Sequence, residues 1–335
     1  MIAKALICSE KQEFTLEPVV IEEPSGEELL VRTLYSGVSI GTEFALIRNK
    51  ISWGPYPLCT GYQGVGVVEQ VGAQVADFSV GDVVYFRDNL PFRLASGEAV
   101  SSVTGTHCSH IRINPRTTHG LARLPEGVSP EVGSLFVMPA VGFKGVDMAN
   151  PRLGELVVVY GAGLIGLGVI AACSLRGCRV LAIDVHEPQL AMARKLGADY
   201  CVNSTTEDAD AALRALAPEG GDVVFECTGI PACVNQALPL ARNFGSFVMQ
   251  GNYGLAPISF DFTAAHARTL TMYFPMDDGQ GPARRAVLKN MAQGALPWEC
   301  TITHRVTPEE APALYTRINT GQAGDVVGAV IKWGE

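Results

Sequence analysis

The chain has 335 residues, of which 47% are hydrophobic and 18% are charged, and its formal net charge is −9 at pH 7. This length suits about two domains with sizeable cores, and the acidic balance argues against binding to nucleic acid or to an anionic membrane surface. The nine cysteines include no C-x-x-C pair, and the first residues hold no apolar run long enough for a signal peptide. We therefore expect a globular cytoplasmic protein with reduced thiols and without nucleic-acid or membrane partners.

Residues 1–125 are rich in short runs that alternate or break like strands. Such runs occupy residues 2–35, and a short helix is predicted at 44–49. Glycine-punctuated strands follow at 61–85, and another alternating strand at 107–114. The N-terminal part is therefore predicted to be all-β with short helices.

From Leu156 onwards the pattern changes to strands that alternate with helices. Leu156 to Tyr160 reads as a buried strand, a glycine-rich turn follows, and an uncharged helix extends to Leu175. A second strand ends at Asp184. Residues 156–175 carry no charge, but glycines interrupt the run and a helix buried against a parallel sheet is expected to be apolar, so we do not interpret it as a membrane span.

The turn after the first of these strands has the spacing G-x-G-x-x-G. Gly161 allows a tight turn, Gly163 lets a pyrophosphate approach the backbone, and Gly166 lets the helix pack close to the strand. The helix N-terminus then presents N–H groups and a positive dipole to the phosphates. Asp184 lies where a ribose-binding acid belongs, and a carboxylate there repels a 2′-phosphate, so NAD is favoured over NADP. The predicted contacts in this unit are Gly161, Gly163, Leu164, Ile165, Gly166, Asp184 and Val185.

The remaining elements continue the alternation to residue 250, as in a doubly wound parallel sheet. A helix at 283–294 and a closing helix and strand within 308–334 follow, and the closing strand is expected to return to the first domain. We predict an α/β chain with two domains. Residues 1–142 and 277–335 form the β-rich domain, and residues 143–276 form a Rossmann dinucleotide-binding domain.

Several local motifs resemble those of one family. Residues 61–72 resemble its G-H-E-x-x-G-x-V-x-x-V-G, and residues 78–84 are similar to its F-x-x-G-D-x-V. The segments 195–199 and 227–229 also have counterparts. The chain is thereby identified as a member of the medium-chain dehydrogenase/reductase superfamily, the zinc-type alcohol and polyol dehydrogenases. This resemblance implies a GroES-like catalytic domain beside the Rossmann domain, NAD-dependent oxidation of CH–OH groups, and a homodimer or homotetramer.

The sequence departs from that family at the zinc ligands. The position of the first cysteine falls on Ser39 or Ile40, and the His-Glu pair is replaced by Tyr62 and Gln63. Residues 132–146, where the third ligand belongs, contain no Cys, His, Asp or Glu. Phenol, amide and aliphatic groups do not form a zinc site. The four-cysteine structural zinc lobe is missing as well, so we expect no metal.

Without zinc, hydride transfer needs a side chain that handles the hydroxyl proton. Tyr62 occupies the position of the zinc-binding histidine, and its phenol could act as acid or base if its pKa is lowered. Thr42 matches the family's proton-relay hydroxyl, and Ser39 and Glu43 belong to the same motif. Lys144 follows the missing third ligand and could lower a neighbouring pKa. Each residue also has a structural interpretation, including a buried hydrogen-bonded pair for Glu43 and an exposed position for Lys144.

Other candidates rest on resemblance or on residue type. By resemblance, Thr228, Gly251, Asn252 and Tyr253 would line the adenosine and nicotinamide. Aromatic residues at loop positions are candidate substrate walls, although such residues are as often plain packing: Trp53, Tyr56, Phe92 and Tyr273. His107 and His110 are expected on a strand, with a substrate contact as the alternative.

The predicted function is zinc-independent hydride transfer between NAD(H) and a secondary alcohol or ketone of a sugar, a cyclitol or another ring-bearing small molecule. The stretch 36–43 also resembles the bacteriochlorophyllide hydroxyethyl dehydrogenase branch, which implies a chlorin substrate. Two alternatives stay open. One is a zinc-free quinone or enone reductase, although its usual Asn-Pro-x-Asp is replaced here by Ile-Gly-Thr-Glu. The other is a non-catalytic dinucleotide-binding protein similar to the lens crystallins of this superfamily.

Overall fold

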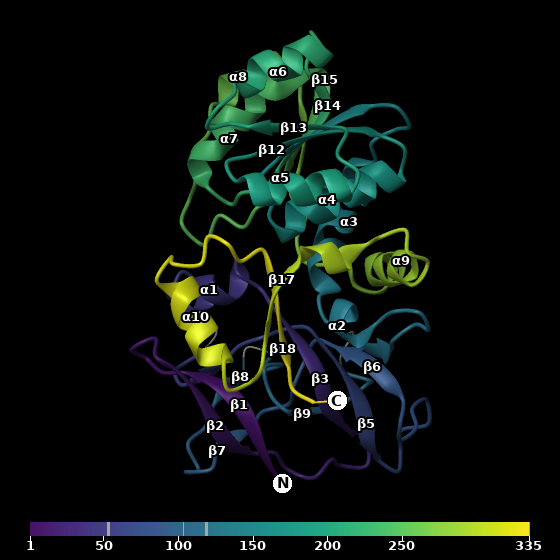
Figure 1. The fold of residues 1–335 in the computed structure, drawn as a ribbon, viewed down its shortest axis with the longest axis vertical. Helices are drawn as coiled ribbons and strands as arrows, with labels where there is room; N and C mark the ends of the chain where they lie inside the picture. The colour runs from purple at the N-terminus through teal and green to yellow at the C-terminus, as the bar shows by residue number, and fades with distance from the viewer. Residues whose placement is uncertain (52–53, 103, 118–119, 335) are drawn as a thin grey trace. The chain divides into compact units, whose positions relative to one another are not determined.

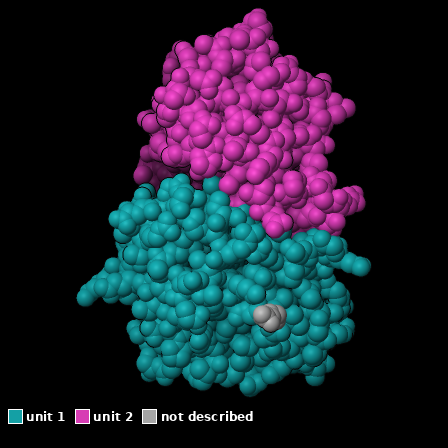
Figure 2. Space-filling model, viewed as in Figure 1, with its two compact units in different colours: residues 1–136, 302–335 teal, residues 137–301 magenta. Residues whose placement is uncertain are grey.

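A computed structural model describes residues 1–51, 54–102, 104–117 and 120–334. The chain divides into two compact units, which Figure 2 colours separately. The first unit is formed by residues 1–136 and 302–335, and the second by residues 137–301. The closing segment of the chain therefore belongs to the same unit as its N-terminus.

Two sheets form the frame of the first unit (Figure 1). Among the described residues, five strands pair in the order β7-β2-β1-β4-β8. Seven more form the second sheet in the order β10-β6-β5-β3-β18-β17, with β9 pairing with β3, again counting only described residues. The strand bounds are β1 Ile2–Cys8, β2 Phe14–Val20, β3 Leu29–Val38, β4 Leu58–Cys59, β5 Gly64–Val71, β6 Val83–Phe86, β7 Arg93–Leu94, β8 Ser101–Ser102, β9 His110–Ile113, β10 Leu121–Arg123, β17 Ile302–Val306 and β18 Gly328–Lys332.

Strand β1 shows how sequence alternation builds this unit. Side chains alternate between the two faces of a strand. Ala3, Ala5 and Ile7 therefore point into one apolar cluster, while Leu6 and Cys8 point into another. The predicted β-rich character of this unit is confirmed. The closing strand β18 pairs antiparallel with β3, which ties the end of the chain to its beginning.

Helices α1 (Thr42–Ile47), α2 (Pro130–Gly133) and α10 (Ala311–Asn319) complete the first unit. Helix α2 begins after Ser129, whose hydroxyl accepts a hydrogen bond from the Val132 N–H, as is typical of an N-cap. Helix α1 follows β3 after a short turn. Helix α10 packs against β2, and both α1 and α10 contribute to the second apolar cluster. The end of β3, α1 and α10 are therefore neighbours in the fold.

The second unit is a doubly wound parallel sheet, as predicted. Its described strands have the order β13-β12-β11-β14-β15-β16, and all neighbours are parallel. The first strand along the chain, β11, is apolar and almost wholly buried because helices cover both faces of the sheet. The bounds are β11 Leu156–Tyr160, β12 Arg179–Asp184, β13 Tyr200–Asn203, β14 Gly221–Glu226, β15 Ala241–Met249 and β16 Thr271–Tyr273.

Helices lie on both faces of this sheet (Figure 1). Leu156 and Val158 pack with residues of α6, α7 and α8, so the alternate residues of β11 face the side covered by α4, which also contacts β11. Within the ranges that the structure describes, no helix is long and apolar enough to cross a membrane. The bounds are α3 Val137–Ala149, α4 Leu164–Leu175, α5 Glu187–Lys195, α6 Ala209–Leu216, α7 Pro231–Ala237, α8 Phe262–Ala267 and α9 Gln280–Ala292, with the 3₁₀ helices η1 Leu238–Leu240 and η2 Trp298–Thr301.

The division between the units differs from the predicted one. Residues 277–301 were expected with the β-rich domain, but they belong to the second unit. Helix α9 packs against α3, and Arg284 of α9 forms a fully buried ion pair with Asp278 at 2.5 Å. Removing either partner of such a pair leaves an uncompensated buried charge. The packing of α9 on α3 holds the segment to the second unit, and the ion pair fixes the start of α9 within the segment.

Candidate functional site

The glycine-rich turn lies between β11 and α4, and its three glycines have different environments. Gly161 has a φ of +99°, a conformation that favours glycine. A Cβ at Gly166 would clash with the carbonyl oxygen of Gly161. Gly163 has a φ of −68°, and a Cβ there would meet no atom within 4 Å. Neither backbone conformation nor packing requires glycine at 163, so the open space above it fits the close approach of a ligand.

Leu164 and Ile165 open α4, which starts directly after Gly163. The N–H groups of a first helical turn have no partner within the helix, and they point along its axis. The turn therefore presents amide donors beside an unobstructed backbone. This is the arrangement that holds a pyrophosphate.

Asp184 ends β12 beside this turn and is half-buried. Its Oδ2 accepts a hydrogen bond from the Ala162 N–H at 2.6 Å, and its Oδ1 accepts one from the His186 N–H at 2.9 Å. The two amides fix the carboxylate next to the glycines. Val185, which follows, is 49% exposed. A carboxylate held in this way can accept hydrogen bonds from ribose hydroxyls and repels a phosphate.

Glu226, a buried carboxylate that the sequence analysis missed, organises the carboxyl end of the neighbouring strand β14. The Thr228 N–H donates to its Oε1 at 2.9 Å, and the hydroxyls of Thr228 and Tyr253 also donate to it. The hydroxyls of these two predicted cofactor contacts are therefore already engaged by Glu226. Gly251 packs closely on the preceding loop, and Asn252 is exposed. The sequence signal that could have identified Glu226 is its position as an acidic residue at the end of a predicted strand.

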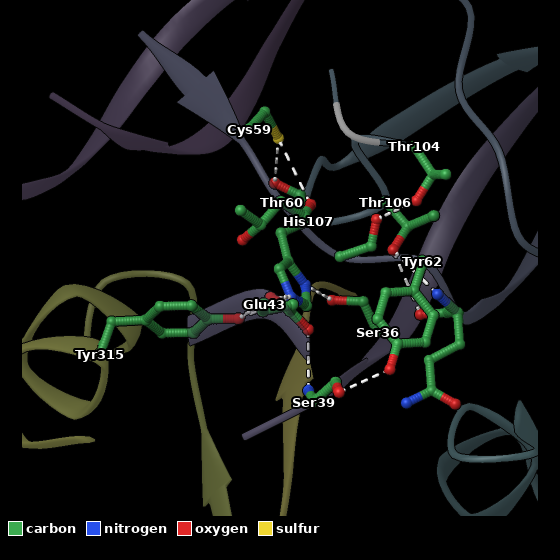
Figure 3. A network of polar contacts seen from close by, with 12 residues as sticks. Ser36, Ser39, Glu43, Cys59, Thr60, Tyr62, Thr104, Thr106, His107 and Tyr315 are labelled. Carbon is green, nitrogen blue, oxygen red and sulfur yellow. Dashed lines mark hydrogen bonds and ion pairs between the residues drawn. The ribbon is translucent and has the colours of Figure 1, made fainter. Parts of the chain in front are cut away.

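In the first unit, three predicted catalytic residues come together. Ser39 follows β3, Thr42 opens α1 and Tyr62 precedes β5. The Tyr62 hydroxyl donates to Ser39 Oγ at 2.5 Å (Figure 3), and the Thr42 hydroxyl also bonds to Tyr62. Because the Tyr62 proton is given to Ser39, Thr42 is the donor in the second bond. The Ser39 oxygen accepts from Tyr62, so its own proton can be given to a further acceptor.

From the sequence, Tyr62 was expected to act as acid or base if its pKa were lowered, but the structure raises this pKa. Burial raises the pKa of Tyr62 to about 12, and the charge of Glu43 acts in the same direction. The hydrogen bonds that link Tyr62 to Ser39 and Thr42, and the positive charge of Arg87, lower this pKa without outweighing burial. The phenol is therefore protonated at neutral pH. In this arrangement Tyr62 is a proton donor.

Glu43 lies behind the three hydroxyls and is fully buried. Its Oε1 accepts the Ser39 N–H at 2.7 Å, and its Oε2 accepts the Tyr315 hydroxyl at 2.7 Å (Figure 3). His107 Nε2 lies 2.9 Å from the same Oε2. Burial alone would raise the pKa of Glu43, but the interactions with His107, the Ser39 amide and Tyr315 outweigh it and lower the pKa. Glu43 is thus an ionised carboxylate whose two oxygens contact protein donors, as the buried-pair interpretation expects.

His107 continues this buried network away from Glu43. Its Nδ1 lies 2.8 Å from Ser36 Oγ, which accepts a hydrogen bond from Trp333 Nε1 at 2.8 Å. Since an ionised carboxylate only accepts, we assign a proton to His107 Nε2 in its contact with Glu43. His107 precedes β9 instead of lying on it. The predicted strand therefore begins later than expected, and no sequence signal joined His107 to Tyr315, which lies 208 positions away.

The predicted substrate walls have separate outcomes. Phe92 is only 5% exposed and belongs to the core of the first unit, so it is a packing residue. Tyr56 packs on the second apolar cluster and its hydroxyl donates to the Ile47 carbonyl at 2.9 Å, which also assigns it to packing. Tyr273 is half-buried at the end of β16. Trp53 lies outside the described residues.

Two further candidates lie elsewhere. Lys144 is on α3 in the second unit, where its stem lies against Gly279 and it lines a groove of about 400 Å³ with Asp147 and Arg176. His110 Nε2 lies 3.5 Å from a carboxylate oxygen of Glu69. Among the described residues, the contacts that join the hydroxyls of Ser39, Thr42 and Tyr62 include neither Lys144 nor His110.

The donors gathered in the first unit do not suit zinc. Zinc sites in proteins use thiolate, imidazole and carboxylate ligands. Ser39, Thr42 and Tyr62 offer hydroxyls, while the nearby carboxylate and imidazole bond to each other. Counting described residues only, no group of three or more His, Cys, Asp or Glu could hold a metal ion. The residues present therefore do not fit a zinc ion.

Comparison with known proteins places the chain in a family. Residues 25–127 match the alcohol dehydrogenase GroES-like domain, and residues 165–287 match the zinc-binding dehydrogenase domain. The chain belongs to the zinc-type medium-chain dehydrogenase/reductase superfamily, which confirms the predicted membership and fold.

Individual relatives agree with this assignment. The D-xylulose reductase of Scheffersomyces stipitis is 28% identical over 296 residues, covering 79% of this chain and 80% of that protein. Sorbitol dehydrogenase 1 of Saccharomyces cerevisiae is 29% identical over 297 residues, covering 82% of each. A solved structure from Sinorhizobium meliloti 1021, described as a zinc-binding dehydrogenase bound to NADP, has a TM-score of 0.86 and 22% identity and covers 99% of each chain.

Proposed function

We propose that this chain is a zinc-independent oxidoreductase that interconverts a secondary alcohol and its ketone with NAD(H). Relatives named as a D-xylulose reductase and a sorbitol dehydrogenase support reaction at a CH–OH group. The observation that carries the proposal is the 2.5 Å hydrogen bond from Tyr62 to Ser39. This bond supports the proposal, because it joins two hydroxyls at positions that resemble those of the family's zinc ligands.

The hydroxyls can deliver the proton that a ketone needs on reduction. A nicotinamide dinucleotide, when bound, supplies the hydride in reduction and accepts it in oxidation. As a C–H bond forms at the carbonyl carbon, the π electron pair of the C=O bond moves onto the oxygen. The Ser39 proton moves to that oxygen, and the Tyr62 proton replaces it on Ser39. Water then returns a proton to the Tyr62 phenolate.

The acidity of Tyr62 supports reduction as the favoured direction at neutral pH. With a pKa of about 12, the phenol is protonated and ready to donate. Oxidation of an alcohol needs the phenolate as proton acceptor, and its fraction rises about tenfold for each pH unit below the pKa. The rate of oxidation should therefore rise with pH, whereas the rate of reduction should be high at neutral pH.

NAD is the dinucleotide that the second unit favours. Asp184 is fixed beside the glycine turn by two backbone amides. Its charge would repel the 2′-phosphate of NADP and its oxygens would accept the ribose hydroxyls of NAD. A fold relative is bound to NADP, so the preference of this chain is a matter for direct measurement.

The test is turnover by the purified, chelator-treated protein. NADH with a panel of ketones, and NAD with sugars, cyclitols and other ring-bearing secondary alcohols, should give turnover without added metal. A requirement for one zinc per chain would overturn the proposal. Turnover confined to quinones or enones would replace it with double-bond reduction. Binding of NAD with no turnover of any alcohol, ketone or enone would replace it with a non-catalytic role.

A further inference from the structure

Arg87 follows β6 and lies against Tyr62. Strand β6 pairs with β5 so that Phe86 is opposite Gly64. The next residue, Arg87, therefore reaches the backbone that precedes β5. Its Nε–H donates to the Tyr62 carbonyl oxygen at 3.3 Å, and its guanidinium carbon lies 5.4 Å from the centroid of the Tyr62 ring. One side chain thus holds both the backbone and the ring of Tyr62.

This contact brings a positive charge to the proton donor. A guanidinium over an aromatic face is attracted by the ring quadrupole. Arg87 also lowers the pKa of Tyr62 through its charge, whereas Glu43 of α1 raises it. The other recorded groups acting on the phenol, Ser39 and Thr42, are neutral hydroxyls. Asp88, the chain neighbour of Arg87, carries a further carboxyl group and is half-buried.

We infer that Arg87 is a positioning residue for Tyr62: it holds the phenol against Ser39 and supplies the positive charge that stabilises the phenolate left after proton donation. This inference rests on the proposed function, because it needs Tyr62 to give up a proton. A zinc ion would otherwise provide positive charge at a developing oxyanion. Here the positive charge comes from the Arg87 guanidinium, whose central carbon lies 5.4 Å from the centroid of the Tyr62 ring. The Tyr62 proton moves to Ser39 as the Ser39 proton moves to the ketone oxygen, so the step needs no co-reactant beyond those of the proposed reaction.

The charge and the contact can be separated by substitution. Arg87→Gln removes the charge, and Arg87→Lys keeps it without the planar fork. We expect Arg87→Gln to lower kcat for ketone reduction about tenfold to hundredfold with KM little changed. Arg87→Lys should lose less. Arg93→Gln is the matched control. Arg93 is an exposed arginine of the same unit, and its side chain donates to the Gly97 carbonyl oxygen.

Arg87→His makes the charge switchable. An ordinary histidine has a pKa of about 6.5, so this variant is cationic at about pH 5.5 and neutral at about pH 8.5. The ratio of its reduction rate to that of Arg87→Gln should be about ten at the lower pH and near one at the higher pH. A purely structural role for Arg87 would leave this ratio flat, and a flat ratio would overturn the inference.

A double-mutant cycle with Tyr62→Phe decides whether Arg87 acts through Tyr62. If it does, Arg87→Gln should cause no further loss of kcat in the Tyr62→Phe background. An equal loss in both backgrounds, or a rise in KM confined to substrates with a carboxylate or phosphate, would overturn the inference while leaving the proposed function standing. Wild-type turnover by Tyr62→Phe alone would instead overturn the proposed function.

Discussion

The Glu43 carboxylate and the His107 imidazole lie 2.9 Å apart, and both side chains are fully buried. The pair joins α1 to the segment before β9, and Tyr315 of α10 donates to the same carboxylate oxygen. Through the Ser39 amide, Glu43 also fixes the backbone of the residue that accepts the Tyr62 proton. The buried pair therefore helps to fix the position of the Ser39 and Tyr62 hydroxyls.

Loss of this support should appear as a pH-dependent loss of stability. Glu43→Gln removes the charge from a site built to hold it, and the free energy of unfolding of the first unit should fall by about 3–5 kcal/mol at neutral pH. The pKa of Glu43 is lowered on folding, so its contribution is complete above the ordinary carboxyl pKa of about 4.3 and is lost as pH falls through the folded value.

Urea unfolding of wild type and Glu43→Gln at neutral pH and in acid measures this contribution. The gap between the two proteins should narrow in acid. Glu126→Gln, at an exposed position of the same unit, should unfold like wild type at both. A gap that stays constant with pH would show that the ionised carboxylate is not what stabilises the unit.

The glycine turn should separate cofactor binding from stability. Gly163→Ala places a methyl group in open space with an allowed φ, so the unfolding temperature should stay unchanged. The same methyl group obstructs a pyrophosphate, and NAD affinity measured by calorimetry should fall about tenfold or more.

Gly166→Ala should have the opposite effect, a loss of stability. Its methyl group clashes with the Gly161 carbonyl, and overpacking of this kind costs about 1–3 kcal/mol of stability. Wild-type NAD affinity in Gly163→Ala would mean that the dinucleotide does not lie over this turn.

Asp184 should decide between the two dinucleotides. Asp184→Asn removes the charge but keeps an oxygen for the backbone amides, so NADP affinity should rise relative to NAD by about tenfold to hundredfold. Asp199→Asn is a suitable control because Asp199 also accepts a backbone amide of β12, from Val180 at 2.7 Å. Fluorescence titration with both dinucleotides gives the ratio. If the ratio is the same in all three proteins, another residue selects the cofactor.

Local spacing was enough to predict the parallel sheet of the second unit. Gly161, Gly166 and Asp184 act within one β-α-β unit, so their roles follow from turn geometry and from the positions of strand ends. The sequence also displays Ser39 and Tyr62 at positions where the family resemblance expects zinc ligands. These features depend on neighbours along the chain, which a sequence displays directly.

The support of the site depends on distant residues and was not predictable in the same way. His107 and Tyr315 meet because β18 returns to β3 and α10 packs against β2. The burial that raises the pKa of Tyr62 comes from the same tertiary packing. The place of residues 277–301 depended on the packing of α9 on α3. Periodicity reports which face of an element is buried but not which element covers it.

The most direct test of the central claim compares Tyr62→Phe with Tyr56→Phe in ketone reduction by NADH, in the presence of a chelator. Tyr56 lies in an apolar cluster with its hydroxyl on a backbone carbonyl, so its variant should turn over like wild type. Tyr62→Phe should lose about 10²–10⁴-fold in kcat, and its alcohol oxidation should no longer rise with pH. Wild-type turnover by chelator-treated Tyr62→Phe would contradict proton handling by Tyr62 and Ser39.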